Sequence, residues 1–405
     1  MELCFKRRRI LKTFLSMSFF LATLVTIHRL TNVNESQKET LGFKATAYFN
    51  PAGPSYNQLS NKGLNLSQPG LKRTQHLDKV PHTSPKWDIP KSICLENQAL
   101  KKQPWFNKMD TRFHQYMLLR HCRYFPMLLN HPEKCHGDVH LLIVVKSLIE
   151  QYDRREAIRR TWGQEEENGE KNIRTLFLLG TTSLGKDHRT LQRLIQQEDQ
   201  IYGDILQWDF LDTFFNLTLK EVNFLKWFHT YCPRVEFVFK GDDDIFVNTK
   251  NILDFLTFRK EEPNLASLFV GDIIHRAVPI RNKQSKYYIP QEMFIGPYPV
   301  YAGGGGFLMS SGLAKRLLPA SEKIPLFPID DVFLGMCLKA VSVKPKFHSG
   351  FRTFGISKRR TSAMNRDPCF YRSLLVVHRL TAPDLVKMWH TVHNNTIKCT
   401  KSVHF

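Results

Sequence analysis

Residues 235–244 read VEFVFKGDDD, an apolar run of strand length that ends in three successive aspartates. Such runs are typical of strands buried on both faces in a parallel sheet. In open α/β sheets ligands bind at the carboxyl ends of the strands, where Asp242, Asp243 and Asp244 fall. Three adjacent carboxylates repel one another unless a cation neutralises them, and carboxylate oxygens suit Mn²⁺ or Mg²⁺. The stretch therefore predicts a buried strand that opens onto a divalent-metal site, with a solvated acidic turn as the alternative.

Strand-like and helix-like segments alternate on the N-terminal side of this stretch. Apolar runs predict strands at residues 139–145, 175–180 and 205–208. Helices are predicted between them, over residues 153–162, 191–202 and 219–231. This alternation predicts an α/β fold with a doubly wound, mostly parallel sheet of Rossmann-like type.

A second acidic pair, Asp330-Asp331, lies among apolar residues in the stretch 328–335. Such a pair is unusual, because Asp is rarely buried without a partner. In a group transfer one carboxylate would take the proton from the attacking hydroxyl, and we favour Asp331 as this catalytic base. The alternative is a pair of N-cap residues that opens a helix over residues 332–340. The two interpretations are compatible, because one aspartate can cap while the other reacts.

A glycine-rich stretch lies between the two acidic segments, where residues 298–307 read YPVYAGGGGF. Four successive glycines permit close approach of the backbone to a ligand. The alternative is a flexible loop without a contact role. Aromatic and apolar residues on both sides favour a packed loop.

The N-terminus predicts a membrane anchor. A basic cluster at residues 6–9 precedes an apolar run over residues 10–27. This order predicts an uncleaved signal-anchor helix, with residues 1–9 in the cytoplasm and the rest of the chain in the lumen. The alternative is a cleaved signal peptide.

The predicted luminal part divides into a stem and a folded domain. Residues 28–103 are polar, without a lasting apolar period, and this predicts a flexible stem. Aromatic and apolar residues return from residue 104 onward. We therefore expect a folded domain over residues 104–405, with residues 104–136 as an N-terminal collar.

Sequons and cysteines agree with a luminal location. Acceptor sites for N-glycosylation occur at Asn34, Asn65, Asn216 and Asn394. The chain has 8 cysteines, and Cys4 falls on the cytoplasmic side. The luminal number is therefore odd, so at least one thiol should be free or pair between chains, while the connectivity stays open.

Several further motifs are spread along the chain. They include residues 155–163 (REAIRRTWG), 177–180 (FLLG), 202–205 (YGDI), 216–220 (NLTLK), and the acidic, glycine-rich and 330–332 (DDV) segments. In their sequence and order these motifs resemble those of glycosyltransferase family 31, and within it the chain resembles the β-1,3-N-acetylglucosaminyltransferases. The resemblance implies a GT-A fold and inverting transfer of N-acetylglucosamine from UDP-N-acetylglucosamine (UDP-GlcNAc) to the 3-hydroxyl of a terminal β-galactose. It also implies extension of poly-N-acetyllactosamine or keratan sulfate-type chains on glycoproteins, by an enzyme of the Golgi membrane.

The motifs and the resemblance together assign roles to residues. His378 occupies the place of the family's metal-ligand histidine, so the expected ligands are Asp242, Asp244 and His378. Expected donor-binding residues are Arg155, Arg159, Asp212, Lys220, Asp242 and Asp243. Expected acceptor-binding residues are Tyr301, Gly304, Gly305 and Asp330. Arg155 and Arg159 lie four apart on one helical face and are expected to hold the diphosphate or uridine, with a solvated basic face as the alternative.

The charge balance bears on the partner. A formal net charge of +21 favours anionic partners. A luminal location makes nucleic acid a poor explanation, and basic residues before the glycines suggest a sulfated acceptor; they are Arg276, Arg281, Lys283 and Lys286. The alternatives are a galactosyltransferase of the same family and a non-catalytic protein that binds sulfated glycans. The expected cofactor is Mn²⁺ or Mg²⁺, and the oligomeric state is left open.

Overall fold

The computed structural model describes residues 86–399, apart from 92–93, 168–170, 184, 186, 260, 262, 358, 360 and 395. All of these belong to one unit, Pro81–Phe405. Among the described residues no helix is long and apolar enough to cross a bilayer. The predicted anchor at 10–27, most of the predicted stem, and the sequons at Asn34 and Asn65 lie outside the described residues.

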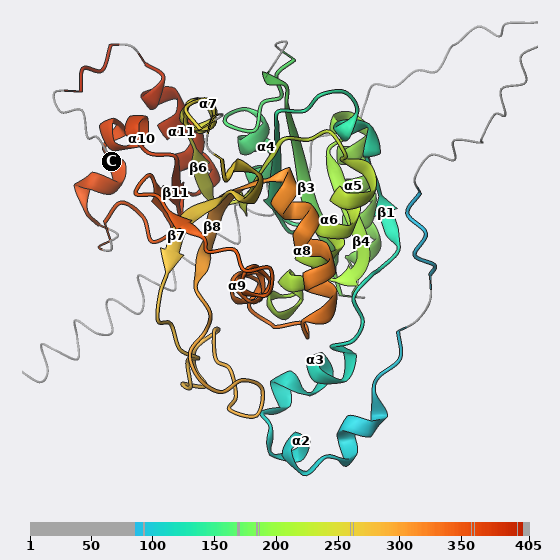
Figure 1. Ribbon diagram of the computed structural model, residues 1–405. Coiled ribbons are helices and arrows are strands. Elements are labelled where there is room, and N and C mark those ends of the chain that lie inside the picture. The colour runs from blue at the N-terminus through green and yellow to red at the C-terminus, as the bar shows by residue number, and fades with distance from the viewer. Residues whose placement is uncertain are drawn as a thin grey trace, which may run out of the picture. The chain divides into compact units, whose positions relative to one another are not determined.

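A mixed sheet of 8 strands forms the centre of the fold, in the order β1-β4-β3-β2-β5-β8-β7-β9 (Figure 1). Its strands are β1 (Met127–Leu129), β2 (Leu141–Lys146), β3 (Ile173–Thr181), β4 (Ile205–Leu211), β5 (Phe237–Asp242), β7 (Phe269–Ile274), β8 (Tyr301–Ser310) and β9 (Lys346–Phe347). Strands β4, β3, β2 and β5 run parallel, whereas β8 is antiparallel to β5 and β7. The parallel block confirms the predicted α/β core, and its strands begin and end within a few residues of the predicted bounds.

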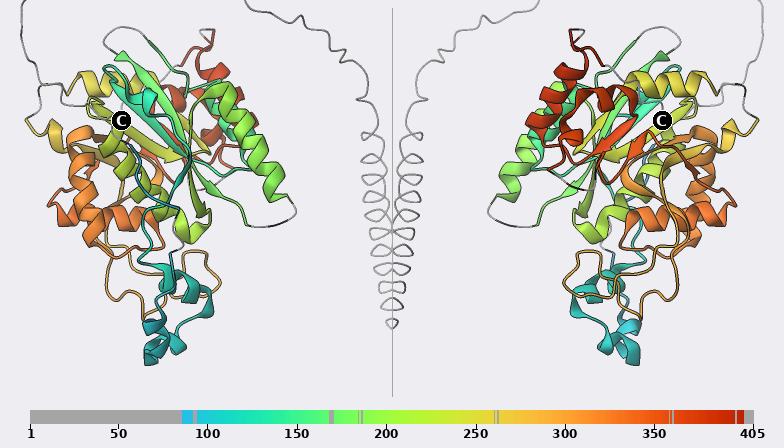
Figure 2. Two further views of the ribbon diagram at one scale, coloured as in Figure 1. Left: turned by 90° about the vertical axis from the view of Figure 1, so that its right-hand side faces the viewer. Right: turned by 90° about the vertical axis from the view of Figure 1, so that its left-hand side faces the viewer.

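Helices cover both faces of the parallel block. They are α4 (Tyr152–Arg159), α5 (His188–Tyr202), α6 (Leu217–Tyr231), α7 (Thr249–Thr257), α8 (Ser311–Lys323), α9 (Asp330–Ala340), α10 (Pro368–Ser373) and α11 (Ala382–Val392). In β2, Leu142 and Val144 pack with residues of α6, α8 and α9, whereas Leu141, Ile143 and Val145 pack with residues of α4, α5 and α7. Figure 2 shows the sheet between α5 on one side and α8 on the other. Residues 141–145 of the strand are all apolar because neither face meets water.

A second, small sheet brings the C-terminal part of the chain to the acidic turn at 242–244. Its strands are β10 (Phe351–Arg352), β11 (Val376–His378) and β6 (Ile245–Val247), in that order. Strand β11 is antiparallel to β6 and places His378 opposite Ile245. Because β6 directly follows the acidic turn, this pairing carries His378 to the carboxylates.

Short helices before β1 pack against the segment that leads into α9. They are η1 (Gln98–Lys102), α2 (Pro104–Lys108), η2 (Thr111–Phe113) and α3 (His114–Leu119), and they project from one end of the domain in Figure 1. Arg123 donates to the carbonyls of Ser321 at 2.7 Å and Ile324 at 2.5 Å, and Arg120 donates to that of Leu326 at 2.5 Å. The Ser321 carbonyl lies in the last turn of α8, and the other two lie between α8 and α9, so the two arginines fix that connection. Further single turns are η3 (Pro132–Cys135), η5 (Phe214–Asn216), η6 (Leu265–Ser267) and η7 (Ala363–Arg366).

Disulfides join Cys94 to Cys122, Cys135 to Cys232 and Cys369 to Cys399. Among the described cysteines, Cys337 of α9 is the free thiol, and it is buried. This arrangement agrees with the expectation that an odd number of luminal cysteines leaves one unpaired.

Candidate active site

A cleft of about 1550 Å³ opens at the carboxyl ends of β2 and β5. It gathers residues from widely separated parts of the chain: Lys146, Ser147, Asp212, Lys220, Asp242, Asp243, Asp244, Gly304, Asp330, Asp331 and His378. This is the edge of an open α/β sheet where ligands bind. Most of the residues predicted for the site therefore lie around one space.

Asp242, Asp244 and His378 converge at one end of the cleft. A carboxylate oxygen of each aspartate and a ring nitrogen of His378 all lie within 4.8 Å of one another. His378 Nε2 is 3.0 Å from Asp244 Oδ1 and 3.9 Å from Asp242 Oδ2. The other ring nitrogen, Nδ1, is 2.8 Å from the carbonyl oxygen of Thr353. A proton on Nδ1 would bond to that carbonyl and leave the Nε2 lone pair facing the carboxylates.

Burial and neighbouring charges shift the pKa values of Asp244 and His378 in opposite directions. Burial alone would lower the pKa of His378, but the hydrogen bond and negative charge of Asp244 outweigh it, so the pKa is raised. Burial alone would raise the pKa of Asp244, but the hydrogen bond and charge of His378 leave it lowered. The set holds two carboxylate oxygens, which suit Mn²⁺ and Mg²⁺, and one oriented imidazole, which is a common ligand of divalent transition metals. These residues therefore fit a divalent cation.

The backbone of the two residues that follow His378 fixes the backbone of Asp244 in place. The amides of Arg379 and Leu380 both donate to the Asp244 carbonyl, at 2.9 and 2.8 Å. Arg379 has a φ of 77°, in the left-handed region that non-glycine residues rarely adopt. This strained residue turns two successive N–H groups onto one carbonyl, and such strain is typical of functional sites.

Asp243 points to a different set of partners from those of Asp242 and Asp244. Ser147 Oγ donates to Asp243 Oδ2 at 2.7 Å, and Arg154 donates to Oδ1 at 2.7 Å. Burial raises the pKa of Asp243, and these two hydrogen bonds only partly offset it. Because protein groups hold both oxygens, Asp243 anchors the turn to its surroundings, and its predicted contact with the donor stays a prediction.

Asp330 and Asp331 occupy the first turn of α9. Ile329 is the N-cap residue, and within the described chain no side chain caps this helix, so the interpretation of the aspartates as N-caps is wrong. Asp330 is buried and accepts a hydrogen bond from Lys146 at 2.6 Å, and Lys146 also lies 3.0 Å from Asp242. Lys146 thus joins the end of the cleft that holds Asp242 to the start of α9.

The pKa of Asp331 is shifted in the opposite direction from that of Asp330. Burial, and then the negative charge of Asp330, raise the pKa of Asp331 well above its usual range. Burial alone would raise the pKa of Asp330 as well, but the charge and hydrogen bond of Lys146 leave it lowered. A carboxylate with a raised pKa is a better proton acceptor, and this is the property that a catalytic base needs.

The glycine-rich stretch is not a loop but the central part of β8. A Cβ on Gly304 would lie 2.8 Å from both carboxylate oxygens of Asp331, and one on Gly305 would lie 3.1 Å from the Cβ of His378. The glycines thus let one strand pass close to both reactive groups. Tyr301 begins the strand, and burial, followed by Asp331 and Tyr287, raises its pKa to about 12.

Asp212 and Lys220 form an ion pair on the opposite wall, with 2.9 Å between Lys220 Nζ and Asp212 Oδ2. Lys220 also donates to the Ser147 carbonyl at 2.5 Å, and Asp212 accepts from the Gly180 amide at 2.9 Å. Both residues line the cleft. The ion pair ties the ends of β2, β3 and β4 together.

Comparison with known proteins identifies the family. Residues 153–348 match the family described as Galactosyltransferase. The chain is 57% identical over 320 residues to the Rattus norvegicus protein named UDP-GlcNAc:betaGal beta-1,3-N-acetylglucosaminyltransferase 7, over 78% of this chain and 80% of that one. The chain belongs to glycosyltransferase family 31. Within the family, the sequence motifs are most similar to those of β-1,3-N-acetylglucosaminyltransferase 7, the same type as this rat relative.

Other relatives carry related names. The Homo sapiens acetylgalactosaminyl-O-glycosyl-glycoprotein beta-1,3-N-acetylglucosaminyltransferase is 42% identical over 318 residues, covering 77% of this chain and 82% of that one. A crystal structure of the galactosyltransferase LgtC with donor and acceptor sugar analogues is a more distant match, 12% identical with a TM-score of 0.31, over 62% of this chain and 96% of that one. That likeness is too distant to support an inference. The sequence relatives establish that this family 31 chain is a glycosyltransferase.

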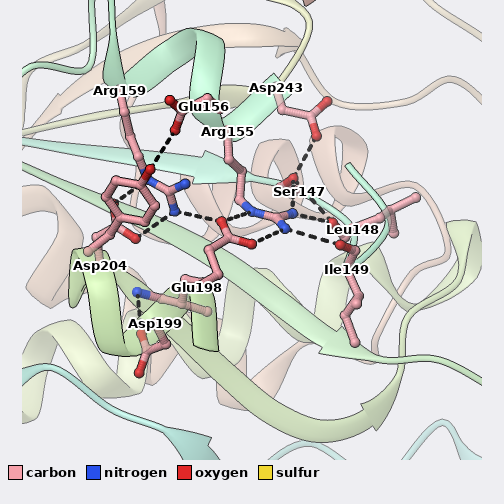
Figure 3. Close-up of polar contacts among 12 residues, drawn as sticks. Ser147, Leu148, Ile149, Arg155, Glu156, Arg159, Glu198, Asp199, Asp204 and Asp243 are labelled. Atoms are coloured by element: carbon pink, nitrogen blue, oxygen red, sulfur yellow. Dashed lines mark hydrogen bonds and ion pairs between the residues drawn. The ribbon is translucent and has the colours of Figure 1, made fainter. Parts of the chain in front are cut away.

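Two of the arginines of α4, the fully buried Arg155 and the largely buried Arg159, are held by other side chains of the protein (Figure 3). Arg155 donates from Nε and Nη2 to Glu198 at 2.7 Å each, and its remaining hydrogen bonds go to oxygens of residues 147–149. Arg159 donates to Glu198 at 2.7 Å and to Asp204 at 2.8 Å. Neither is among the described residues that line the cleft. The alternative of a solvated basic face is therefore wrong, and the direct contact with the donor stays a prediction that the burial of these arginines does not support.

Lys146 is the main site residue of this family 31 enzyme that the sequence analysis missed. It is buried, and three carboxylates, those of Asp242, Asp330 and Asp331, raise its pKa well above the usual range although burial alone would lower it. One signal was available, because Lys146 ends the apolar run of β2 at the edge of the sheet where ligands bind. A charged residue there needs an acidic partner.

The described sequons differ in exposure. Asn394 is exposed, and its side-chain oxygen accepts hydrogen bonds from Thr396. Asn216 is half-buried, and its side-chain nitrogen donates to the Leu211 carbonyl at 2.8 Å. Glycosylation stays a prediction at both positions, and Asn394 is the more accessible acceptor.

Proposed function

We propose that this chain transfers N-acetylglucosamine from UDP-GlcNAc to the 3-hydroxyl of a terminal β-galactose, with inversion, and so extends poly-N-acetyllactosamine or keratan sulfate-type glycans. The single observation that carries this proposal is the convergence of Asp242, Asp244 and His378 with Asp331 on one cleft. The name of the rat relative supports the choice of donor and acceptor.

Two groups of residues would divide the work of transfer. Asp242, Asp244 and His378 would hold Mn²⁺ or Mg²⁺, which offsets negative charge on the UDP leaving group. Asp331, with its raised pKa, accepts the proton of the acceptor 3-hydroxyl. Lys146 holds Asp330 ionised and connects it to Asp242, so the two groups keep a fixed separation.

An aromatic surface lines the same cleft as Asp331 and would receive the acceptor. Phe214 and Tyr287 line the cleft with ring centroids 5.6 Å apart, and Lys286 Nζ lies 5.5 and 4.8 Å from their centroids. The apolar face of galactose can pack on such rings, and the ammonium group can meet an anionic substituent. These residues add to the predicted acceptor contacts of Tyr301, Gly304, Gly305 and Asp330.

The location and architecture follow from the same proposal. We propose a GT-A catalytic domain in the Golgi lumen, with a flexible stem over residues 28–103 and a signal-anchor helix at residues 10–27. The parallel strands that end in an acidic turn support the first part. The basic and apolar N-terminal pattern supports the second.

A donor competition tests the proposed function. The full-length chain, supplied with Mn²⁺ and a β-galactose-terminated acceptor, is offered UDP-GlcNAc and UDP-galactose in separate reactions, and the linkage of the product is determined. We expect acceptor-dependent UDP release from UDP-GlcNAc and a β-1,3 product. Preference for UDP-galactose would instead indicate a galactosyltransferase, and acceptor binding without UDP release would indicate a glycan-binding protein.

Acceptor charge is tested with sulfated and unsulfated lactosamine acceptors across salt concentrations. If the basic residues near the cleft select a sulfated acceptor, its KM should rise with salt while that of the unsulfated acceptor changes little. Lys286→Met should remove much of this difference. Equal salt dependence for both acceptors would show that the positive charge has another role.

A further inference from the structure

The loop that follows β2, residues 147–149, forms a wall shared by two spaces. Ser147 and Leu148 line the main cleft, and Leu148 and Ile149 also line a hollow of about 420 Å³. Asp212 lines both spaces, so the hollow adjoins the cleft. The position of this short loop therefore sets the shape of the cleft wall.

Arg155 holds this loop from within the protein (Figure 3). Its Nη1 donates to Ser147 Oγ at 3.1 Å and to the Leu148 carbonyl, and its Nη2 donates to the Ile149 carbonyl at 3.0 Å. Arg155 is fully buried, and the bidentate pair with Glu198 fixes the plane of its guanidinium group. A lysine could keep the charge but could not form this fork of hydrogen bonds.

Ser147 passes this constraint on to the acidic turn. Its hydroxyl accepts from Arg155 and donates to Asp243 Oδ2 at 2.7 Å. Its carbonyl accepts from Lys220 Nζ at 2.5 Å, and Lys220 is paired with Asp212. Ser147 thus connects the buried Arg155 both to Asp243 of the acidic turn and to the ion pair of Lys220 with Asp212.

We propose that Arg155, held by Glu198, is a positioning residue for the nucleotide-sugar donor, because it fixes the 147–149 loop and, through Ser147, the acidic turn. The inference rests on the proposed function, since it assumes that the donor occupies this part of the cleft. In this role Arg155 acts without touching the donor, because it is fully buried and is not among the described residues that line the cleft. A small displacement of positioning groups is enough to weaken binding and catalysis strongly.

Arg159 supplies a matched control. It is held by the same Glu198, it is also largely buried, and it lies one turn further along α4, but its described hydrogen bonds go to Glu198 and Asp204 and not to the loop. Arg155→Lys and Arg159→Lys should therefore both lower Tm. We expect only Arg155→Lys to raise the KM for UDP-GlcNAc, by about tenfold or more, with the acceptor KM within about twofold of the original.

The full-length chain with added Mn²⁺ is used for all measurements, and UDP affinity is measured by calorimetry alongside the kinetics. An equal donor KM in Arg155→Lys and the unchanged chain would show that Arg155 serves stability alone and would overturn the proposal. If Arg155→Lys does not fold, Ser147→Ala decides, because it removes only the link from the arginine to Asp243. We expect a raised donor KM and weaker UDP binding in Ser147→Ala, and unchanged values would overturn the proposal.

Failure of the proposed function gives a different result. In that case the unchanged chain releases no UDP from UDP-GlcNAc in response to a galactose acceptor. UDP affinity still tests the role of Arg155, because any uridine nucleotide donor would occupy the same wall. Weaker UDP binding in Arg155→Lys than in Arg159→Lys supports the proposal even then, and equal binding contradicts it.

Discussion

The acidic turn at 242–244 and the acidic pair at 330–331 both consist of aspartates, but the pKa of Asp244 is lowered whereas that of Asp331 is raised. In each, one aspartate is held by a cation or hydroxyl of the protein: Asp243 is held by Ser147 and Arg154, and Asp330 by Lys146. The neighbouring aspartates then diverge. His378 lowers the pKa of Asp244 against the effect of burial, whereas burial and Asp330 raise that of Asp331.

This difference shows how one residue type serves two purposes in a single cleft. A carboxylate beside an imidazole stays ionised and suits a metal ligand. A carboxylate beside another carboxylate in a buried site takes up a proton more readily and suits a base. Four predictions test the contrast, beginning with the largest expected effect.

Removal of divalent metal should abolish transfer. With excess EDTA, we expect UDP release to fall to background and to return on addition of Mn²⁺ or Mg²⁺, because the acidic turn then lacks the charge that offsets the leaving group. The measurement is acceptor-dependent UDP release before and after metal addition. Full turnover in EDTA would exclude a metal role for Asp242, Asp244 and His378.

The substitution Asp331→Asn should affect transfer but not UDP binding, and so distinguish the role of the acidic pair from that of the acidic turn. We expect transfer to fall by about 100-fold or more, since the general base is lost, while UDP binding stays unchanged because the acidic turn is intact. Single-turnover rates and calorimetric UDP affinity check the two halves. Retention of more than about a tenth of the original rate would remove Asp331 as the base.

Within the acidic turn, Asp243→Asn and Asp244→Asn should differ. We expect Asp244→Asn to lower kcat/KM by about 100-fold, because it removes a metal-facing oxygen. Asp243→Asn should lower it by roughly tenfold or less, because Asn still offers an oxygen to Ser147 or Arg154. Titration with Mn²⁺ provides the second readout, and equal losses in the two variants would contradict the division of roles.

The smallest expected effect is a shift in the pH dependence of the transfer rate. A base works when deprotonated, so the rate should rise with pH through the raised pKa of Asp331. Asp330→Asn removes a neighbouring negative charge, lowers the pKa of Asp331, and should therefore shift the acidic limb of the kcat profile to lower pH. An unchanged limb, or a shift to higher pH, would show that Asp330 does not control the protonation of Asp331.

The sequence predicted those parts of the fold whose physical cause is local. Strand β5 and its acidic turn were predictable because a continuous apolar run and the charges that end it are adjacent in the chain. The burial of Arg155 was not, since its partner Glu198 lies on another helix. The spacing of Arg155 and Arg159 indicates a shared helical face but not which way that face points.

Three other features escaped prediction for related reasons. Glycines carry no side-chain period, so the stretch in β8 looked like a loop, although its strand hydrogen bonds come from neighbours far along the chain. Strands β6 and β11 are each 3 residues long, too short for a period-2 pattern to be recognised. Lys146 and its acidic partners meet only after the sheet and α9 have packed.

The pairing of β11 with β6 has a consequence for the order in which the protein is made. The ribosome delivers the four parallel strands and the acidic turn long before His378, which is placed opposite Ile245 near the end of the chain. The disulfide between Cys369 and Cys399 then encloses β11 and α11. A chain that stops before residue 376 would retain every strand of the parallel block but lack the imidazole, so premature termination would remove His378 from the site without removing the part of the sheet that is synthesised first.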